Sequence, residues 1–194
     1  MSRKEAIMEA ATQLFAQRGF TATSTSAIAK EAGVAEGLIF HHYKTKDGIL
    51  LRILEKMTEY YLSGSRSSVQ NCRTGLDAVK AYIRFHFEFS IEHSDALAVL
   101  VRTLPFSIIQ SGDESFEVLK QGINSVIGLW EKCIDQGKKD GTIRDIPTKE
   151  TAHLLRGMLI GVSRSRVLGT IEVPDLGSHV VDFCVSAMGR RADE

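Results

Sequence analysis

The sequence has few cysteines and no long apolar run. Cys72, Cys133 and Cys184 are odd in number and far apart, and they form no CxxC pair. This pattern argues against a disulfide framework and a zinc knuckle, so we expect reduced, mostly buried thiols in a cytoplasmic protein. No apolar run approaches the roughly 18 residues that a membrane-spanning helix needs, and we therefore expect no membrane partner.

The sequence also lacks an excess of either charge, because 24 Lys and Arg residues balance 24 Asp and Glu residues. A nucleic-acid-binding domain usually has a pI above about 9, so this balance argues mildly against DNA binding. It does not exclude DNA binding, since a local basic rim is sufficient and an acidic second domain can cancel its charge. The beginning of the chain is polar and helical in pattern, unlike a signal peptide.

What is present is a globular composition with helical periodicity. The 194 residues are 43% hydrophobic and 25% charged, which fits one or two domains with a sizeable core. Near the N-terminus, apolar residues recur at the spacing of an amphipathic helix that Gly19 closes. Ser24 is placed to cap a second helix. The apolar face of the first helix is Ile7, Ala10, Ala11, Leu14 and Phe15.

Residues 25–46, TSAIAKEAGVAEGLIFHHYKTK, predict two short helices that cross at a tight turn. Ile28 and Ala29 face inward on the first helix, and Ile39 faces inward on the second. Gly33 lies between them, where a left-handed backbone is needed that only glycine adopts at low cost. This is the spacing of a helix-turn-helix, whose second helix enters the DNA major groove. An ordinary helical hairpin is the alternative.

The flanking residues favour the helix-turn-helix. The segments AATQLFAQRGF, TSTSAIAKEAGV, GLIFHHY and KTKDGIL follow one another within residues 3–50, and this region resembles the N-terminal domain of TetR-family transcriptional regulators. Helical periodicity along the chain predicts an all-α fold of about nine helices, and the resemblance favours the same fold. A three-helix DNA-binding domain would occupy residues 1–47, and a ligand-binding and dimerisation domain residues 48–194. Beyond residue 50 the chain is similar to the family only in length and helical character.

Periodicity predicts the later helices. A fourth helix begins near Thr45, and the SGSRSS segment at residues 63–68 is interpreted as the loop that ends it. Residues 81–91 alternate as in a strand but also fit helical spacing, and we predict a helix over 74–92 because an isolated strand would have no partner. Further helices are predicted over about residues 95–104, where Pro105 ends the helix, and over 114–138, 148–168 and 174–188.

The resemblance also implies which side chains contact DNA. Lys46, at the start of the fourth helix, is the strongest candidate for a phosphate contact. Glu36 either accepts a hydrogen bond from cytosine N4 or is a solvated acid at a helix start. Phe40 stands where the family commonly has Tyr, so the hydroxyl that would bind phosphate is absent. The predicted DNA-binding residues are Thr25, Ser26, Ala35, Glu36, Gly37, Leu38, His41, His42, Lys44 and Lys46.

The second half of the chain offers large apolar side chains for a small-molecule site. The resemblance implies a cavity between the helices there, and plain core is the alternative for each residue. Arg84, His86 and Arg102 are the polar groups that could hold a ligand, and a carboxylate would suit an arginine. The predicted ligand-binding residues are Met57, Tyr61, Phe85, Phe89, Arg102, Phe106, Phe116, Trp130 and Leu159.

The resemblance further implies a homodimer formed through the last two helices. Gly157 and Gly161 lie four residues apart there and would let helices approach closely. The alternative is packing within one chain.

We therefore expect a homodimeric repressor that a small-molecule effector releases from a palindromic DNA operator. One alternative is a DNA-binding regulator that responds to a protein partner or to no effector at all. The other is a small-molecule-binding protein with weakened DNA binding. We expect no enzyme and no cofactor, because GxSxG, HExxH and P-loop patterns are absent. We expect no metal, because His86 and His93 are two helical turns apart.

Overall fold

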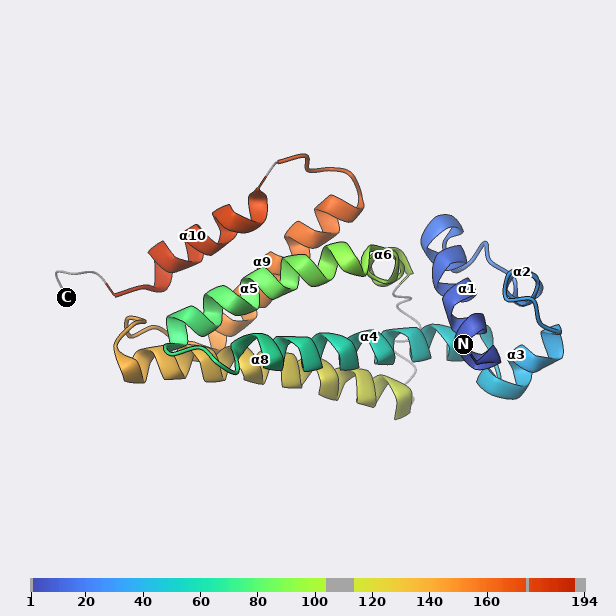
Figure 1. Ribbon diagram of the computed structural model, residues 1–194, viewed down its shortest axis with the longest axis horizontal. Coiled ribbons are helices and arrows are strands. Elements are labelled where there is room, and N and C mark those ends of the chain that lie inside the picture. The colour runs from blue at the N-terminus through green and yellow to red at the C-terminus, as the bar shows by residue number, and fades with distance from the viewer. Residues whose placement is uncertain (1, 104–113, 174, 191–194) are drawn as a thin grey trace. The chain divides into compact units, whose positions relative to one another are not determined.

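A computed structural model describes residues 2–103, 114–173 and 175–190, and these residues form helices joined by short turns (Figure 1). Within these ranges the chain contains no β-strand, only an isolated bridge between Ile143 and Gly189. The predicted all-α class is confirmed. The helices are α1 Arg3–Arg18, α2 Thr25–Glu31, α3 Glu36–Tyr43, α4 Lys46–Val69, α5 Gly75–Glu92, α6 Ser94–Thr103, α8 Glu114–Asp140, α9 Thr148–Val167 and α10 Leu176–Met188.

The chain divides into two compact units. The first unit comprises residues 1–59 and 93–120, and the second comprises residues 60–92 and 121–194. Helices α4 and α8 therefore contribute residues to both units. The predicted domain boundary near Asp47 falls in the first turn of α4, which continues unbroken past it, and that boundary stays a prediction.

Helix α1 of the first unit has the face that the sequence predicts. Its start is closed by a capping box, in which the Ser2 hydroxyl accepts from the Glu5 N–H and the Glu5 carboxylate accepts from the Ser2 N–H. It ends at Gly19, whose φ of 82° favours glycine. Helix α6 packs against α1 within this unit. The buried residues of α1 are Ile7, Ala10, Ala11, Leu14, Phe15 and Ala16.

Helix α4 continues through the SGSRSS segment, so the loop predicted at residues 63–68 is wrong. The hydroxyl of Ser65 donates to the Leu62 carbonyl at 3.1 Å, and that of Ser68 to the Ser65 carbonyl at 2.8 Å. Such bonds to the carbonyl three residues earlier satisfy the hydroxyls within the helix, although they do not favour it over a loop. Gly64 faces the ring of Phe85 on α5, and a Cβ there would overlap that ring. Contact with α5 therefore keeps this Gly- and Ser-rich stretch helical.

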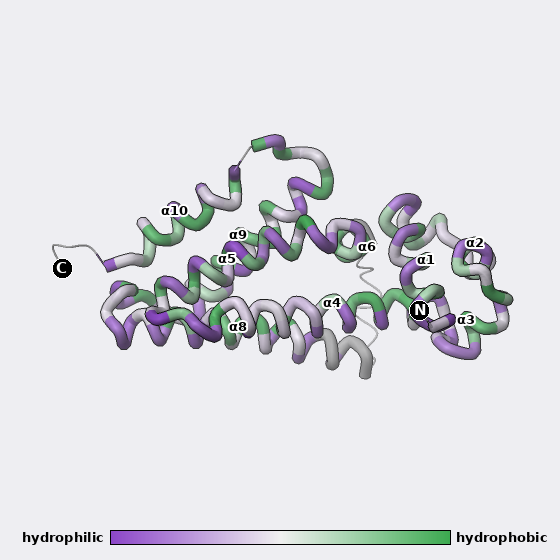
Figure 2. The backbone as a smooth tube through the Cα atoms, in the orientation of Figure 1, coloured by the Kyte–Doolittle hydropathy of each residue, from purple (hydrophilic) through white to green (hydrophobic). Residues whose placement is uncertain are grey.

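Helix α5 confirms the helical interpretation of residues 74–92 over the strand alternative. Its buried residues, which include Val79, Ile83 and His86, recur at helical spacing. Figure 2 shows polar and apolar residues alternating along the helices, as expected where each helix buries one face.

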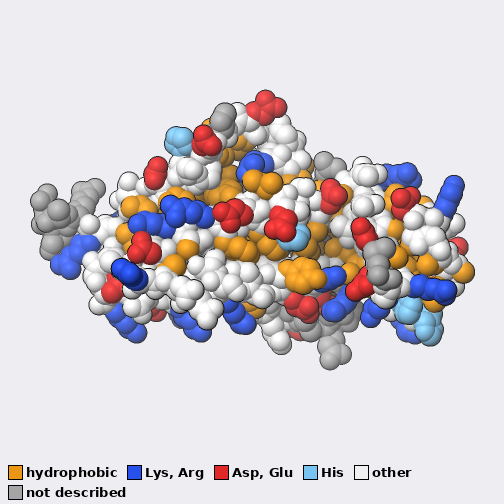
Figure 3. Space-filling view, in the orientation of Figure 1, with side chains coloured by type: hydrophobic (Ala, Val, Ile, Leu, Met, Phe, Trp, Pro, Cys, Tyr) orange, Lys and Arg blue, Asp and Glu red, His pale blue; other side chains and the backbone are white. Residues whose placement is uncertain are grey.

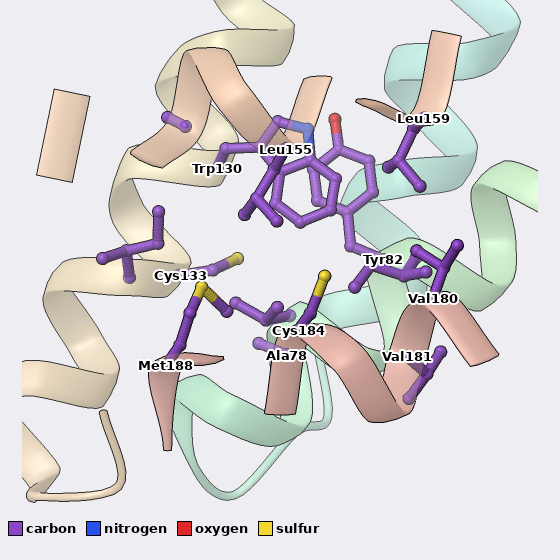
Figure 4. Close-up of a cluster of buried hydrophobic side chains, with 14 of the residues drawn as sticks. Ala78, Tyr82, Trp130, Cys133, Leu155, Leu159, Val180, Val181, Cys184 and Met188 are labelled. Atoms are coloured by element: carbon purple, nitrogen blue, oxygen red, sulfur yellow. The ribbon is translucent and has the colours of Figure 1, made fainter. Parts of the chain in front are cut away.

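The core of the second unit is built on stacked aromatic rings. The rings of Tyr82 and Trp130 lie 3.8 Å apart between centroids and are inclined by 4° (Figure 4). Side chains from α5, α8, α9 and α10 surround them. Cys133 and Cys184 are buried there, and burial raises the pKa of both thiols to about 11. They are therefore protonated and unreactive near neutral pH, in line with the expectation of buried thiols.

Candidate functional site

The helix-turn-helix is formed by α2, the turn at Gly33 and α3. The Ser24 hydroxyl caps α2 by accepting from the Ala27 N–H at 3.1 Å. Gly33 has a φ of 64°, and the Val34 N–H then donates to the Ala29 carbonyl at 3.0 Å. Both features follow the sequence prediction. Ile28 and Ile39 are fully buried, so the two helices share one core.

Helix α3 exposes its first turn. Ala35 stands at the N-cap without a side-chain hydrogen bond, which leaves the first N–H groups of the helix uncapped by a side chain. Glu36 and Gly37 are exposed, and nothing lies within 4 Å of a Cβ built at Gly37. Figure 3 shows exposed histidine side chains over α3. Of the predicted DNA-binding residues on and around α3, Ala35, Glu36, Gly37, His41 and Lys44 are exposed, and Leu38 and His42 are half-buried.

Two of the predicted DNA-binding residues are hydrogen-bonded to each other. The Thr25 hydroxyl, at the start of α2, donates to Glu36 Oε1, at the start of α3, at 2.6 Å. Ser26 beside them is exposed. The contact joins the first turns of the two helices on the outer side of the helix-turn-helix.

The ammonium of Lys46 is directed into the protein's own loop. It donates to the carbonyls of Phe20 at 2.8 Å and Thr23 at 2.9 Å, and it lies over the Phe20 ring. The Thr23 hydroxyl in turn donates to the Gly19 carbonyl at 2.8 Å. Two of the three ammonium donors are thus bonded to backbone carbonyls of the same chain. The sequence did not indicate Phe20 and Thr23 as partners of Lys46, and its only signal was the pair of threonines between Phe20 and the Ser24 cap.

The turn between α3 and α4 positions Lys44. Its φ of 65° lies in the left-handed region that a non-glycine residue rarely adopts. The Tyr43 hydroxyl beside it donates to the Lys4 carbonyl at 2.8 Å and ties this turn to α1. The strained backbone is therefore held by a contact to a separate helix, and it carries an exposed lysine at the end of α3.

A buried polar centre links α4, α5 and α9 in the second unit. His86 Nε2 lies 3.2 Å from the Leu159 carbonyl and 2.9 Å from Ser163 Oγ, and Nδ1 lies 3.0 Å from the Tyr61 hydroxyl. Nε2 carries the proton, because a carbonyl only accepts, and Tyr61 therefore donates to Nδ1. Burial lowers the pKa of His86 to about 4, so the ring is neutral near pH 7.

Aromatic rings surround Tyr61. Its ring centroid lies 5.4 Å from that of Phe85 and 5.2 Å from that of Phe89. The structure thus brings together three of the predicted ligand-binding residues. Met57 is half-buried on α4 in the first unit, whereas Trp130 and Leu159 are in the packed core of the second. The predicted residues Arg102, Phe106 and Phe116 lie outside the side chains that the structure describes.

The second unit also contains Arg156 on α9 and Arg84 on α5. Burial raises the pKa of Tyr61, and that of Tyr82 to about 12, while the positive charge of Arg156 opposes both rises. Arg156 is half-buried on α9. Arg84 lines a hollow of about 220 Å³ between α5 and α10, together with Phe87, Glu88, Ile91, Gly177, Ser178, Val181 and Asp182.

Helices α9 and α10 carry exposed apolar side chains. Leu154 is 72% exposed and Phe183 is 65% exposed, with Ile160 and Leu168 also on the surface. On the same helix as Leu154, a Cβ at Gly157 or Gly161 would meet nothing within 4 Å. Large exposed apolar side chains of this kind mark candidate interaction surfaces.

The described residues provide neither a membrane-spanning helix nor a metal-binding cluster. Across the part of the chain that is described, no helix combines the length and the apolarity to cross a membrane. The same residues contain no group of three His, Cys, Asp or Glu side chains that could hold a metal ion.

Comparison with known proteins places the helix-turn-helix in a family. Residues 7–53 match the model of the bacterial regulatory proteins of the tetR family. The fatty acid metabolism regulator protein of Bacillus subtilis is 24% identical over 166 residues, which cover 86% of this chain and 78% of the relative. The HTH-type transcriptional repressor KstR2 of Rhodococcus jostii is 25% identical over 188 residues, covering 96% of this chain and 91% of the relative. Both bear the names of regulators rather than enzymes.

Solved structures share the fold. The transcriptional regulator FadR from Bacillus subtilis, crystallised in complex with stearoyl-CoA, superposes with a TM-score of 0.79 at 19% identity. The superposition covers 94% of this chain and 97% of that one. The matched helix-turn-helix, the relatives that span most of the chain and the common helical fold together show that this chain is a transcriptional regulator of the TetR family.

Proposed function

We propose that the protein is a homodimeric repressor that leaves a palindromic operator when it binds a small-molecule effector. One observation carries this proposal: α3 exposes its first turn while Ile39 behind it is fully buried. A recognition helix needs this combination, because its inner face must be held rigidly while its outer face meets base edges. We place the protein in the cytoplasm with its DNA.

The surface of α9 and α10 supports a dimer formed through these two helices. Leu154 and Ile160 are exposed beside Gly157 and Gly161, which have open space where a side chain would stand. Covering such a surface with a second copy removes apolar area from water, worth about 25 cal/mol per Å². A two-fold dimer would present two α3 helices to successive major grooves, roughly 34–36 Å apart, and so the operator would be palindromic.

The aromatic residues around Tyr61 support an apolar effector. Phe85 and Phe89 lie within 6 Å of Tyr61, measured between ring centroids, and both are only half-buried. The positive charges of Arg84 and Arg156 in the same unit suit an anionic group on that effector. The first compounds to test are long-chain acyl-CoA esters, since FadR from Bacillus subtilis was crystallised with stearoyl-CoA.

Two helices could carry the signal from effector to DNA. Helix α4 runs without a break from Lys46, in the first unit, through Tyr61, in the second. Helix α6 follows α5 after a single residue, His93, and packs on α1. A displacement of Tyr61 or Phe89 would thus act on helices that belong to the DNA-binding unit. Effector and operator affinities should be coupled by about 1–3 kcal/mol.

The test is site selection from a random DNA pool with the purified protein, followed by binding assays with and without stearoyl-CoA. We expect a two-fold symmetric site, an affinity that falls steeply with salt concentration and release of the DNA by stearoyl-CoA. Effector binding without salt-dependent DNA binding would support the alternative of weakened DNA binding, to which Phe40 in place of Tyr would contribute. Operator binding that no acyl-CoA alters would exclude this effector class.

A further inference from the structure

We infer that Thr25 positions Glu36 to select cytosine in the operator, rather than serving as a phosphate contact itself. This inference rests on the proposed DNA-binding function and names the base chemistry of that site. It starts from the 2.6 Å hydrogen bond between the Thr25 hydroxyl and Glu36 Oε1.

The single proton of Thr25 is committed to this bond. A carboxylate only accepts hydrogen bonds, so Thr25 must be the donor. A hydroxyl has one O–H, and Thr25 therefore cannot donate to a phosphate while it holds Glu36. Both residues occupy the first position of their helices, and Ile28 and Ile39 fix these helices against each other. The side chain of Glu36 is consequently anchored at both its backbone and its carboxylate.

The other oxygen of Glu36 is free to act on DNA. Glu36 has no ion-pair partner among the described residues, and its side chain is exposed. The neighbouring Gly37 has open space beside it, so the backbone of α3 can approach a groove closely. The N-terminus of α3 also favours a negative charge at this position. An uncompensated acceptor in the major groove needs a donor from the base.

Cytosine satisfies this requirement best of the four bases. It presents its N4 amino group without an adjacent acceptor in the major groove. Guanine presents the acceptors N7 and O6, and thymine presents the acceptor O4 and a methyl group, so both repel or exclude a carboxylate. Adenine places the acceptor N7 beside its N6 amino group, which opposes the second carboxylate oxygen. Each half-site should therefore contain one cytosine that Glu36 recognises.

The experiment compares base selection by the wild type, Glu36→Gln, Thr25→Val and Thr25→Ser. A glutamine both donates and accepts, as adenine N6 and N7 require, so Glu36→Gln should change one selected cytosine in each half-site to adenine. Thr25→Val keeps the shape but removes the hydroxyl, and it should relax selection at that same position by about tenfold. Thr25→Ser restores the hydroxyl and should retain the cytosine preference.

Salt titrations distinguish positioning from phosphate contact. Thr25→Val should leave the slope of log affinity against log salt unchanged on a nonspecific duplex. A uniform loss on all sequences with unchanged base selection would overturn the inference, as would a wild-type site with no cytosine that depends on Glu36. Circular dichroism melting of each variant verifies folding. If the wild type selects no DNA at all, the proposed DNA-binding function fails; if it selects a site that Glu36→Gln does not alter, only this inference fails.

Discussion

The Lys46 ammonium lies 4.3 Å from the centre of the Phe20 ring, while it donates to the carbonyls of Phe20 and Thr23. One side chain at the start of α4 thereby closes the loop between α1 and α2. This loop leads directly into Ser24, the cap of α2. The position of the helix-turn-helix thus depends on a lysine that the sequence associates only with phosphate.

Lys46→Met should lower the free energy of unfolding by about 1–3 kcal/mol, because charge-assisted hydrogen bonds to two carbonyls are lost while the apolar stem remains. Urea denaturation followed by circular dichroism measures the change. If Lys46 contacts phosphate as well, DNA affinity should fall about equally on all sequences, with a salt slope smaller by about 1. Unchanged stability with a reduced salt slope would show that the phosphate contact is its main role.

Tyr61→Phe should lower the free energy of unfolding by about 1–3 kcal/mol, because the buried Nδ1 of His86 loses its donor. Ser163→Ala removes one of the two acceptors of Nε2, while the Leu159 carbonyl remains, and should cost less. A double-mutant cycle between Tyr61 and Ser163 measures their coupling through the imidazole. Strict additivity of the two losses would argue against a connected network.

Acidification should destabilise the protein through His86. Burial lowers its pKa from 6.5 to about 4, so between these values the unfolded chain binds more protons than the folded chain. The stability that depends on a neutral His86 is fully present above about pH 6.5. The free energy of unfolding then falls by on the order of 3 kcal/mol as the pH drops towards 4. Urea midpoints of the wild type and His86→Gln at several pH values test this. Equal losses in both proteins would contradict it.

Two glycine-to-alanine changes should have opposite effects. A Cβ at Gly64 would overlap the Phe85 ring, and Gly64→Ala should destabilise by about 1–3 kcal/mol despite the better helix propensity of alanine. The Cβ of Gly157→Ala would lie in open space in the single chain, so this variant should raise the free energy of unfolding by up to about 1 kcal/mol. It should also weaken the proposed dimer, as sedimentation would measure. Gly64→Ala with Phe85→Leu should recover stability if the overlap is the cause.

A flexible joint in α4 should uncouple effector from operator. Replacing Thr58 and Glu59 by two glycines weakens the helix by about 2 kcal/mol relative to two alanines and keeps its register. The glycine variant should still bind operator, whereas its release by the proposed effector should be reduced. The alanine variant is the control and should respond as the wild type does. An unchanged response in the glycine variant would leave α6 as the carrier of the signal.

The sequence predicted those features that depend on neighbouring residues. The cap at Ser24, the left-handed turn at Gly33 and the inward face at Ile39 all follow from local spacing and backbone preference. The SGSRSS segment was misjudged because its helix is stabilised from outside, where Gly64 faces Phe85. Local composition indicated a loop there, and packing against α5 determined the outcome.

The partners of the candidate site could not be read from the sequence for the same reason. His86 contacts Ser163, which is 77 residues away, and Lys46 contacts the Phe20 carbonyl, which is 26 residues away. Helical periodicity tells which side of a helix is buried, but it does not tell which side chain of another helix lies opposite. Contacts between residues on different helices could therefore be identified only from the three-dimensional structure.

The stack of Tyr82 on Trp130 has a practical consequence, because the chain contains a single tryptophan. Trp130 is 1% exposed in the core of the second unit, so its emission should shift to longer wavelength only when that core opens to water. The first unit, residues 1–59 and 93–120, contains no tryptophan and therefore does not contribute to this emission. Fluorescence and circular dichroism recorded together would thus reveal whether the two units melt as one or in succession.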